Sequence, residues 1–315
     1  MNNIPFILTF GSCGWDKIFS QNEDGTQELI YEEEGRKNSH QALAVKRAGA
    51  NSMLISFVGD DEIGKRVLDS LNNCGIDTRF VKVVENQSTE INHQILDPKT
   101  KDYALVRFPS PLSQYYTPDM VETYKEWILK ADAVILVSKQ NKDFLEAIID
   151  FCYENNIPTV LTVSHEKFDI SDSKDFETLK KVTFIAGNFS EAKTLTKKED
   201  EHDMLSLLPN LIITKGENGV SFINELGEYS HEDAVKVNNV VETNGAGDTF
   251  IGTFIVYYIK GLDKTTCIQI GQCASSLEIQ KMGVLDAIPY KEDIEKSYEE
   301  YYKKSLPKNI IRNKD

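Results

Sequence analysis

Val240-Val-Glu-Thr-Asn-Gly-Ala-Gly-Asp-Thr-Phe-Ile-Gly252 is the stretch from which the fold of this chain is inferred. A β-branched run ends at Glu242, a Gly-Ala-Gly turn follows, and an apolar segment begins after it. This order predicts a strand, a turn and a helix. The first amides of the predicted helix have no partner inside it, and Gly245 and Gly247 have no Cβ to keep an anion away. The turn is therefore a candidate anion site.

Asp248 stands in the first turn of this predicted helix, where its carboxylate would repel a bound anion. Its position is explained if Asp248 takes a proton from a hydroxyl group that attacks a phosphoryl group, while the nearby amides stabilise the developing charge. A single Gly-x-Gly-Asp is also typical of an ordinary helix start. The rest of the chain has to decide between these interpretations.

Composition limits the classes of partner. The chain has 315 residues, of which 40 % are apolar and 27 % charged, and its net charge of −15 comes from 50 acidic and 35 basic residues. An acidic protein of this kind is not expected to bind nucleic acid or an anionic membrane. Apolar runs are too short to span a bilayer. The five cysteines form no Cys-x-x-Cys and indicate reduced thiols, so a cytoplasmic location is expected.

The first half of the chain begins with an apolar strand at 4–10, and the turn Gly11–Asp16 leaves its carboxyl end. Ligands bind at that end of open parallel sheets, so Asp16 is a candidate for holding substrate hydroxyl groups. An Asp that bonds to its own turn is the alternative. Helix 42–48, strand 54–58 and a helix from 59–64 to residue 73 are expected next.

Alternating residues on both sides of the turn Glu23–Thr26 predict a β-hairpin within 17–34. Further alternating strands are expected at 80–84, 90–96 and 103–108, the last two separated by the turn Asp97–Thr100. With the hairpin they form a small β patch. Residues 17–34 and 88–108 are assigned to this patch as an inserted lid, and residues 1–16, 35–87 and 109–315 to the core.

From Thr117 onward, short apolar strands alternate with helices. Strands are expected at 133–137, 159–163, 183–186 and 211–214, each after a helix (118–130, 142–155, 176–181 and 190–195). A hairpin at 219–223 and 228–237 precedes the opening stretch, and helices follow at 249–260, 263–281 and from residue 291, with a frayed tail after Pro307. This alternation predicts a parallel sheet covered by helices on both faces.

Four motifs occur in an order that resembles the ribokinase family, also called PfkB carbohydrate kinases, over residues 6–289. They are Val58-Gly-Asp-Asp-Glu-Ile-Gly64 with the later Gly75-Ile-Asp-Thr78, Asn188-Phe-Ser-Glu191, Ile213-Thr-Lys-Gly-Glu-Asn-Gly219, and Glu242-Thr-Asn-Gly-Ala-Gly-Asp-Thr-Phe250. The resemblance implies an α/β, ribokinase-like fold, in which a central, mostly parallel sheet is flanked by helices on both faces and carries a small β-sheet lid.

The same resemblance implies a kinase that moves the γ-phosphoryl group of ATP to a hydroxyl group of a small sugar or sugar derivative, a reaction that depends on positioning and charge neutralisation. Asp248 would be the general base, and the anion hole would be formed by Asn244, Gly245, Ala246 and Gly247. Mg²⁺ would be organised by Asn188 and by Glu191 through water. The nucleotide would contact Thr214, Gly216 and Gly219, and a closed lid would keep water from the phosphoryl group.

Two positions in Gly35–Ala42 depart from the family pattern of Gly-Gly followed by Asn. Arg36 stands in place of the second Gly, and His40 in place of the Asn that binds the sugar. A stiffer lid hinge and a changed sugar contact are therefore expected. Arg36 and Lys37 either meet an anionic group of the substrate or lie on the surface. The expected substrate contacts are Asp16, Gly35, Lys37 and His40, with Asn92 and Arg107 from the lid.

Two further departures concern bound ions and adenine. Glu242 replaces the family Asp that often helps to hold a monovalent cation, so K⁺ is a candidate cofactor beside ATP and Mg²⁺. Gln272 falls where many members carry an Asn near the adenine. Taken alone, Asn188-x-x-Glu is more typical of a helix N-cap, and the glycines at 59 and 64 are expected to be structural.

Two other functions stay open. A nucleoside kinase would use the same fold, and four aromatic residues could stack a base: Trp15, Phe19, Tyr31 and Tyr103. A non-catalytic relative would bind a metabolite and regulate a partner. A dinucleotide-binding dehydrogenase is disfavoured, because Gly11-x-x-Gly14 is not Gly-x-Gly-x-x-Gly. A homodimer through the lid strands is expected by resemblance to the family.

Overall fold

A nine-stranded sheet forms the centre of the molecule in the computed structural model, which describes residues 4–22, 24–96, 103–108, 111–164 and 167–307, with backbone alone for 103–108 and 111. The strand order is β13-β12-β11-β10-β9-β8-β1-β4-β5. Its strands are β1 (Phe6–Phe10), β4 (Asn51–Gly59), β5 (Asp77–Val84), β8 (Ala133–Val137), β9 (Thr159–Thr162), β10 (Phe184–Asn188), β11 (Leu211–Thr214), β12 (Val220–Ile223) and β13 (Tyr229–Glu232). Neighbours pair in parallel except at β12, which is antiparallel to both β11 and β13.

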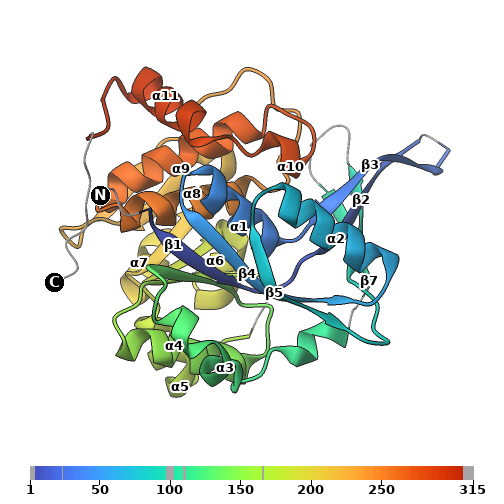
Figure 1. The fold of residues 1–315 in the computed structure, drawn as a ribbon. Coiled ribbons are helices and arrows are strands. Elements are labelled where there is room, and N and C mark those ends of the chain that lie inside the picture. Colours follow the sequence, from blue (N-terminus) through green and yellow to red (C-terminus); the bar gives the residue numbers. More distant parts are fainter. Residues whose placement is uncertain (1–3, 23, 97–102, 109–110, 165–166, 308–315) are drawn as a thin grey trace.

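Helices cover both faces of this sheet (Figure 1). One face carries α3 (Met120–Ile128), α4 (Lys142–Glu154), α5 (Ser173–Lys181), α6 (Phe189–Thr196) and α7 (Glu201–Leu207); the other carries α1 (Lys37–Arg47), α2 (Glu62–Asn73), α8 (Ala246–Ile259), α9 (Lys264–Glu278), α10 (Val284–Ala287) and α11 (Lys291–Tyr302). Short 3₁₀ turns are formed by Pro111–Tyr115 and Gly216–Asn218. No helix in the described ranges is long and apolar enough to cross a bilayer.

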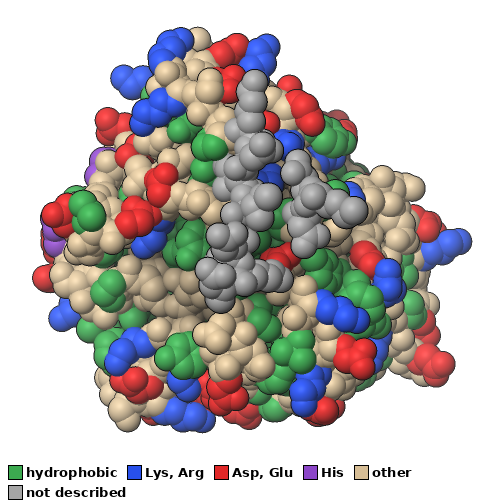
Figure 2. Space-filling view, turned by 60° about the vertical axis from the view of Figure 1, so that its left-hand side comes forward, with side chains coloured by type: hydrophobic (Ala, Val, Ile, Leu, Met, Phe, Trp, Pro, Cys, Tyr) green, Lys and Arg blue, Asp and Glu red, His purple; other side chains and the backbone are tan. Residues whose placement is uncertain are grey.

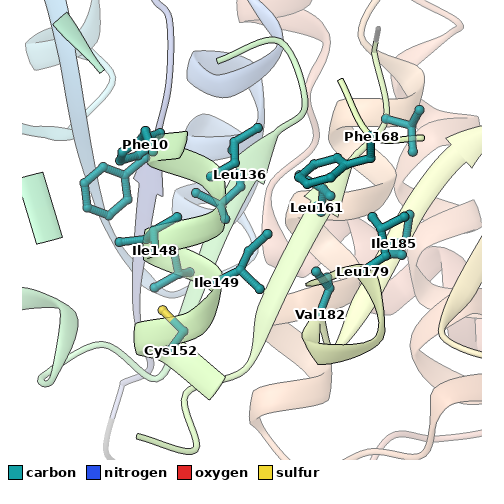
Figure 3. Packing of buried hydrophobic residues seen from close by; sticks show 14 of the residues in the cluster. Phe10, Leu136, Ile148, Ile149, Cys152, Leu161, Phe168, Leu179, Val182 and Ile185 are labelled. Carbon is teal, nitrogen blue, oxygen red and sulfur yellow. The ribbon is translucent and has the colours of Figure 1, made fainter. Parts of the chain in front are cut away.

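Side chains that alternate along the buried strands supply two separate cores. In β1, Ile7 packs with α8 and α9 on one face, and Leu8 and Phe10 pack with α4 on the other. Figure 3 shows Phe10 and Leu136 against Ile148 and Ile149 of α4. This two-sided burial explains why the strands are continuous apolar runs in the sequence. The mostly parallel sheet with helices on both faces is confirmed.

A second, four-stranded sheet has the order β3-β2-β6-β7 and stands at one side of the core (Figure 1). It consists of β2 (Gly14–Gln21), β3 (Gln27–Gly35), β6 (Ile91–Leu96) and β7 (Tyr103–Phe108). We call this sheet the lid. On the face in Figure 2, acidic and basic side chains are interspersed, so the net negative charge is not gathered there.

Several sequence-based expectations about these elements differ from the structure. The strand at 80–84 is part of β5, which pairs with β4 at the edge of the main sheet and not with the lid. Val240–Glu242 is not a strand; the amides of Val241 and Glu242 donate to the carbonyl of Ile279 instead. Helix α1 begins at Lys37, five residues before the predicted start, and α7 was not expected. The turn at 97–100 and the tail after residue 307 lie outside the described residues.

The difference at 240–242 has a physical cause. β-branched residues favour an extended backbone but do not supply a neighbouring strand. Here β13 already ends the sheet, and the extended segment runs beside the end of α9. Lys37–Gln41 was not predicted to be helical because it is polar. These residues are buried in the site or face it, so tertiary contacts outweigh the apolar pattern.

Candidate active site

A cavity of about 550 Å³ opens at the carboxyl ends of the parallel strands. Residues that follow β1, β8 and β9 line it together with the ends of β10 and β11, including Ser12, Lys139, Ser164, Gly187 and Thr214. The chain order reverses between β1 and β8, and a crevice at such a switch point is where open α/β sheets bind ligands. The lid supplies the remaining wall.

Two helices point their N-termini into this cavity. α1 and α8 pack against each other at Gly252, where a Cβ would lie 2.5 Å from the Cβ of Ala44 and 2.6 Å from the carbonyl oxygen of Gln41. The absence of a side chain at Gly252 therefore lets the two helices approach closely. As a result, the run at 35–41 and the turn at 243–248 face each other although they are about 200 residues apart in the chain.

The glycine turn before α8 has the geometry that an anion site needs. Gly245 is the N-cap residue with φ +87°, a conformation that L-residues with a Cβ rarely adopt. Asn244, Gly245 and Gly247 line the cavity, and a Cβ at Gly247 would meet no atom within 4 Å. Ala246 begins the helix but does not line the cavity; its carbonyl accepts a hydrogen bond from Ser275 Oγ. The first amides of the helix have no partner inside it.

Asp248 is buried in the first turn of α8 and lines the cavity. Gln41 Nε2 donates to its Oδ1 at 2.9 Å, and His40 Nδ1 lies 4.0 Å from its Oδ2. Burial raises the pKa of Asp248 to about 7, although Lys37 and the Gln41 bond lower it. A carboxyl group whose pKa lies close to neutrality can act as a general base.

The polar start of α1 lies beside Asp248. His40 is buried and lines the cavity, and burial lowers its pKa to about 4, so its ring is neutral at physiological pH. Its Nε2 has no hydrogen-bond partner among the described residues. Lys37 is the first residue of α1, and its Nζ is 3.1 Å from Glu191 Oε1 and 3.4 Å from the carbonyl oxygen of Val163. Both side chains can meet a ligand in the cavity.

In the lid, Asp16 lies within β2, so the expectation that it belongs to the turn after β1 is wrong. Asn92 Nδ2 donates to its Oδ1 at 2.8 Å, and Gln94 Nε2 to its Oδ2 at 2.7 Å. A Cβ at Gly35 would overlap this carboxylate, which explains the glycine. Arg107 pairs with Asn92 through the backbone, but its side chain is outside the described part. Asp16, Asn92 and Gln94 line the cavity, and Gly35 does not.

Arg36, the residue that replaces a family Gly, has an unusual backbone. Its φ of 148° and ψ of 151° lie in a region populated almost only by glycine, which costs on the order of 1–3 kcal/mol for other residues. Its side chain is buried in the cavity wall, with Nη1 3.6 Å from Asp16 Oδ1 and Nη2 3.2 Å from Glu90 Oε1. Arg36 is therefore not a surface residue.

The residues expected to contact Mg²⁺ or the nucleotide fall into two groups, those that line the cavity and those that do not. Asn188 and Glu191 form the capping box of α6, with Glu191 Oε2 accepting from the Asn188 amide at 2.9 Å, so the structural alternative for this motif is realised. Both residues and Thr214 nevertheless line the cavity. Gly219 and Gln272 do not: a Cβ at Gly219 would overlap the carbonyl oxygen of Glu232, and Gln272 Nε2 donates to the same oxygen at 3.4 Å. Gly216 is exposed with φ +55° and also lies outside the cavity lining.

Glu242 is buried, and both of its oxygens already accept hydrogen bonds. Tyr31 Oη of the lid donates to Oε1 at 2.7 Å, and the amide of Gly283 to Oε2 at 3.0 Å. Among the described residues, no group of three His, Cys, Asp or Glu side chains is arranged to hold a metal ion. A monovalent cation at Glu242 stays a prediction.

Gln41, Gln94 and Lys139 are polar residues of the site that were not predicted. Gln41 and Gln94 orient the carboxylates of Asp248 and Asp16, and Lys139 lines the cavity after β8. Gln94 stands two residues from Asn92 and therefore on the same side of its strand, a signal present in the sequence. Lys139 follows the carboxyl end of a buried strand, which is also a readable signal. Gln41 is brought to Asp248 only by the crossing of α1 and α8.

Comparison with known proteins gives three findings. The model of the "pfkB family carbohydrate kinase" matches residues 37–291. A ribokinase of Bacillus subtilis is 25 % identical over 300 residues, covering 92 % of this chain and 98 % of the relative, and a deoxyribokinase of Salmonella typhi is 23 % identical over 265 residues, covering 81 % and 84 %. Among solved structures, an Arabidopsis thaliana ribokinase complexed with ribose and ATP has a TM-score of 0.80 at 20 % identity over 94 % of this chain and 99 % of that one.

A nucleoside kinase has a similar fold. The Burkholderia thailandensis nucleoside kinase in complex with inosine aligns with a TM-score of 0.78 at 19 % identity, covering 96 % of this chain and 99 % of that one. At this level of identity, both structural comparisons show the ribokinase-like fold alone.

Proposed function

The chain belongs to the pfkB family of carbohydrate kinases, which are phosphotransferases, and we propose that it transfers the γ-phosphoryl group of ATP to a hydroxyl group of a small sugar or sugar derivative. The observation that carries this proposal is the position of Asp248. Its buried carboxyl group lies in the first turn of α8, beside the amides of the glycine turn and in the same cavity as Asp16.

In this proposal, Asp248 accepts the proton of the attacking hydroxyl group. Gln41 fixes the direction of its carboxylate through the bond to Oδ1, so the free Oδ2 faces the acceptor. The amides of Gly245 and Gly247 and the side chain of Asn244 stabilise the charge that develops on the phosphoryl oxygens, whereas the amide of Ala246 donates to the carbonyl of Thr243 at 3.4 Å. Helix α8 adds to this effect, since its positive dipole end lies at the same turn.

The substrate would be held between the lid and the start of α1. Asp16 and Asn92 offer hydrogen-bonding groups from the lid, and neutral His40 offers a donor or an acceptor from the core. The apolar contribution to the cavity lining comes only from small or aliphatic side chains among the described residues: Val137, Ala186 and Ile251. A lining of this kind suits a polyhydroxylated molecule better than an aromatic base.

The described aromatic residues do not support the nucleoside alternative. Trp15 is buried under the guanidinium group of Arg66, which lies 4.1 Å from its ring, and Phe19 packs against His93. Tyr31 is bonded to Glu242. None of Trp15, Phe19 and Tyr31 lines the cavity, and the side chain of Tyr103 is not described. Nucleosides therefore enter the assay as competitors and not as the preferred class.

A Mg²⁺ site at Glu191 is part of the proposal. Glu191 lines the cavity with a carboxylate, the ligand type that Mg²⁺ prefers, and among the described residues its Oε1 forms an ion pair with the partly exposed Lys37. When bound, Mg²⁺ neutralises charge on the phosphate oxygens. Asn188 orients Glu191 through the capping box. A role of K⁺ near Glu242 stays a prediction, which turnover with and without K⁺ tests.

Two wider predictions belong to the same proposal. A cytoplasmic location is consistent with five unpaired cysteines. A homodimer through the lid is supported by Leu29 and Ile30 on the edge strand β3, which are 46 % and 41 % exposed. Light scattering after gel filtration would give the mass of the native protein and of Leu29→Lys, and a monomeric native protein would contradict the dimer.

The test of the reaction is a coupled ADP-release assay on sugars, sugar acids, sugar phosphates and nucleosides, with native protein and Asp248→Asn side by side. We expect one sugar-like acceptor to be turned over and the substitution to lower that turnover by about 10²- to 10⁴-fold. Turnover in Asp248→Asn close to that of the native protein would refute the role of the base. A native protein that turns over no acceptor on the panel would favour the non-catalytic, metabolite-binding alternative.

A further inference from the structure

Three segments that join the lid to the core lie close to one side chain, that of Arg36. β2 begins at Gly14, β3 ends at Gly35, and β6 begins directly after Glu90. Arg36 follows Gly35 in the chain, and its guanidinium group reaches the other two segments: Nη2 is 3.2 Å from Glu90 Oε1, and Nη1 is 3.6 Å from Asp16 Oδ1 in β2. Arg36 thus links the end of β3 to a residue within β2 and to the residue that precedes β6.

The neighbouring glycines leave room for these ion pairs. Gly14 and Gly35 are register partners in β2 and β3. A Cβ at Gly14 would lie 3.1 Å from Arg36 Nε and 2.5 Å from the carbonyl oxygen of Glu90, and a Cβ at Gly35 would overlap the Asp16 carboxylate. The Arg36 guanidinium group therefore packs against Gly14, and the Asp16 carboxylate packs against Gly35.

Further contacts tie this cluster to the core. Lys139 Nζ, which follows β8, is 2.5 Å from Glu90 Oε1, and the amide of Trp15 donates to the carbonyl of Glu90 at 2.9 Å. The carbonyl of Arg36 accepts from the amide of His40 at 2.9 Å, inside the first turn of α1. The backbone at Arg36 is held at φ 148° even though this conformation favours glycine. Such a conformation persists only where the surrounding contacts determine it.

We propose that Arg36 is a positioning residue that braces the lid against the core and directs Asp16 into the cavity, so that the substrate half of the cleft is formed before the substrate binds. This inference rests on the proposed function for its kinetic part, because Asp16 is a substrate contact only there. Its structural part, a lid held in place by Arg36, stands on the contacts alone.

Arg36 also affects the charge of Asp16. Burial raises the pKa of Asp16 to about 6, while the Arg36 guanidinium group lowers it. Removal of Arg36 therefore moves the pKa of Asp16 upward, and a protonated Asp16 accepts fewer hydrogen bonds from substrate hydroxyl groups. The KM for the acceptor then rises on the acid side, in a pH range where the native protein still binds well.

The test compares Arg36→Gly, which removes the ion pairs and suits the backbone, with Arg36→Lys, which keeps a positive charge. Arg79→Gly is the control for the loss of an arginine ion pair outside the cavity lining, because it removes the exposed pair in β5 in which Arg79 Nη2 lies 2.8 Å from Asp77 Oδ2. For Arg36→Gly we expect at least a tenfold higher KM for the acceptor, with less than a threefold change in kcat and in KM for ATP. The rise of the acceptor KM on the acid side should begin at a higher pH than in the native protein. Arg36→Lys should restore part of the loss.

Hydrogen exchange without any ligand tests the brace separately from catalysis. Amides of β2 and β6 should exchange at least tenfold faster in Arg36→Gly than in the native protein and in Arg79→Gly. Unchanged hydrogen exchange in the lid would overturn the brace. So would a fall in kcat as large as the rise in KM, with no change in the pH dependence of KM. A native protein that phosphorylates no acceptor would refute the proposed function, while faster lid exchange in Arg36→Gly would still support the brace.

Discussion

Asp248→Asn is expected to stabilise the folded protein at pH 8 while it removes the activity. The pKa of Asp248 is raised by burial from its ordinary value of 3.8 to about 7. The folded state therefore binds this proton more tightly than the unfolded state does. Stability falls as pH rises from the unfolded pKa to the folded pKa, and above pH 7 the buried carboxylate carries its full penalty. An amide of the same shape does not carry this penalty.

The size of the gain follows from the two pKa values. At 1.36 kcal/mol per pKa unit, the interval from 3.8 to about 7 sets an upper limit of about 4 kcal/mol at pH 8. At pH 5, where only the interval from 3.8 to 5 contributes, the same limit is about 1.6 kcal/mol. In the variant, Gln41 can still donate to the oxygen of the introduced amide, but a bond to a neutral acceptor is weaker, so we expect a gain of about 1–3 kcal/mol at pH 8.

Urea unfolding at pH 8 and pH 5 measures the free energy of unfolding of both proteins. Asp60→Asn is the matched control, since it removes the same charge from an exposed position at the start of α2. Turnover in the ADP-release assay should fall by about 10²- to 10⁴-fold in Asp248→Asn, the range for the loss of a general base. A variant that is less stable than the native protein at pH 8, or equally stabilised at both pH values, would refute the raised pKa.

Three other substitutions test separate parts of the structure. Gly245→Ala places a Cβ at φ +87° and 2.6 Å from a carboxylate oxygen of α9, so unfolding free energy should drop by about 2 kcal/mol or more; Gly247→Ala, whose Cβ meets nothing within 4 Å, should be far milder in the same urea titration. Burial raises the pKa of Glu34 to about 8, and its side chain is closed off from solvent, so Glu34→Gln should stabilise the protein at pH 9 and progressively less towards pH 5; an equal effect at both would contradict this sign. Tyr31→Phe removes the 2.7 Å hydrogen bond to Glu242 and should lower the free energy of unfolding by about 1–2 kcal/mol, measured by thermal unfolding. An unchanged melting temperature would mean that the Glu242 carboxylate finds another donor.

The sequence by itself was sufficient for the architecture, and it also assigned residues to a site whose chemistry stays a prediction. Apolar strands that alternate with helices, together with the glycine turn ending at Asp248, predict the parallel sheet and an anion site because these signals are local. The capping box at Asn188 and Glu191 was readable for the same reason, since its spacing depends only on helix geometry.

Tertiary structure alone decided how distant segments combine. Val240–Glu242 has strand-like residues but no neighbouring strand, and β5 joins the main sheet because β4 offers it a parallel edge. Gln41 reaches Asp248 because α1 and α8 cross, although the two residues are about 200 positions apart in the chain. Arg36 could be noticed as an unusual residue, but whether it faces solvent, the substrate or the lid depends on where Asp16 and Glu90 come to lie. Pattern in the chain determines what each segment can form, whereas the pairing of segments is a choice among competing long-range contacts, and that choice is made only when the chain packs.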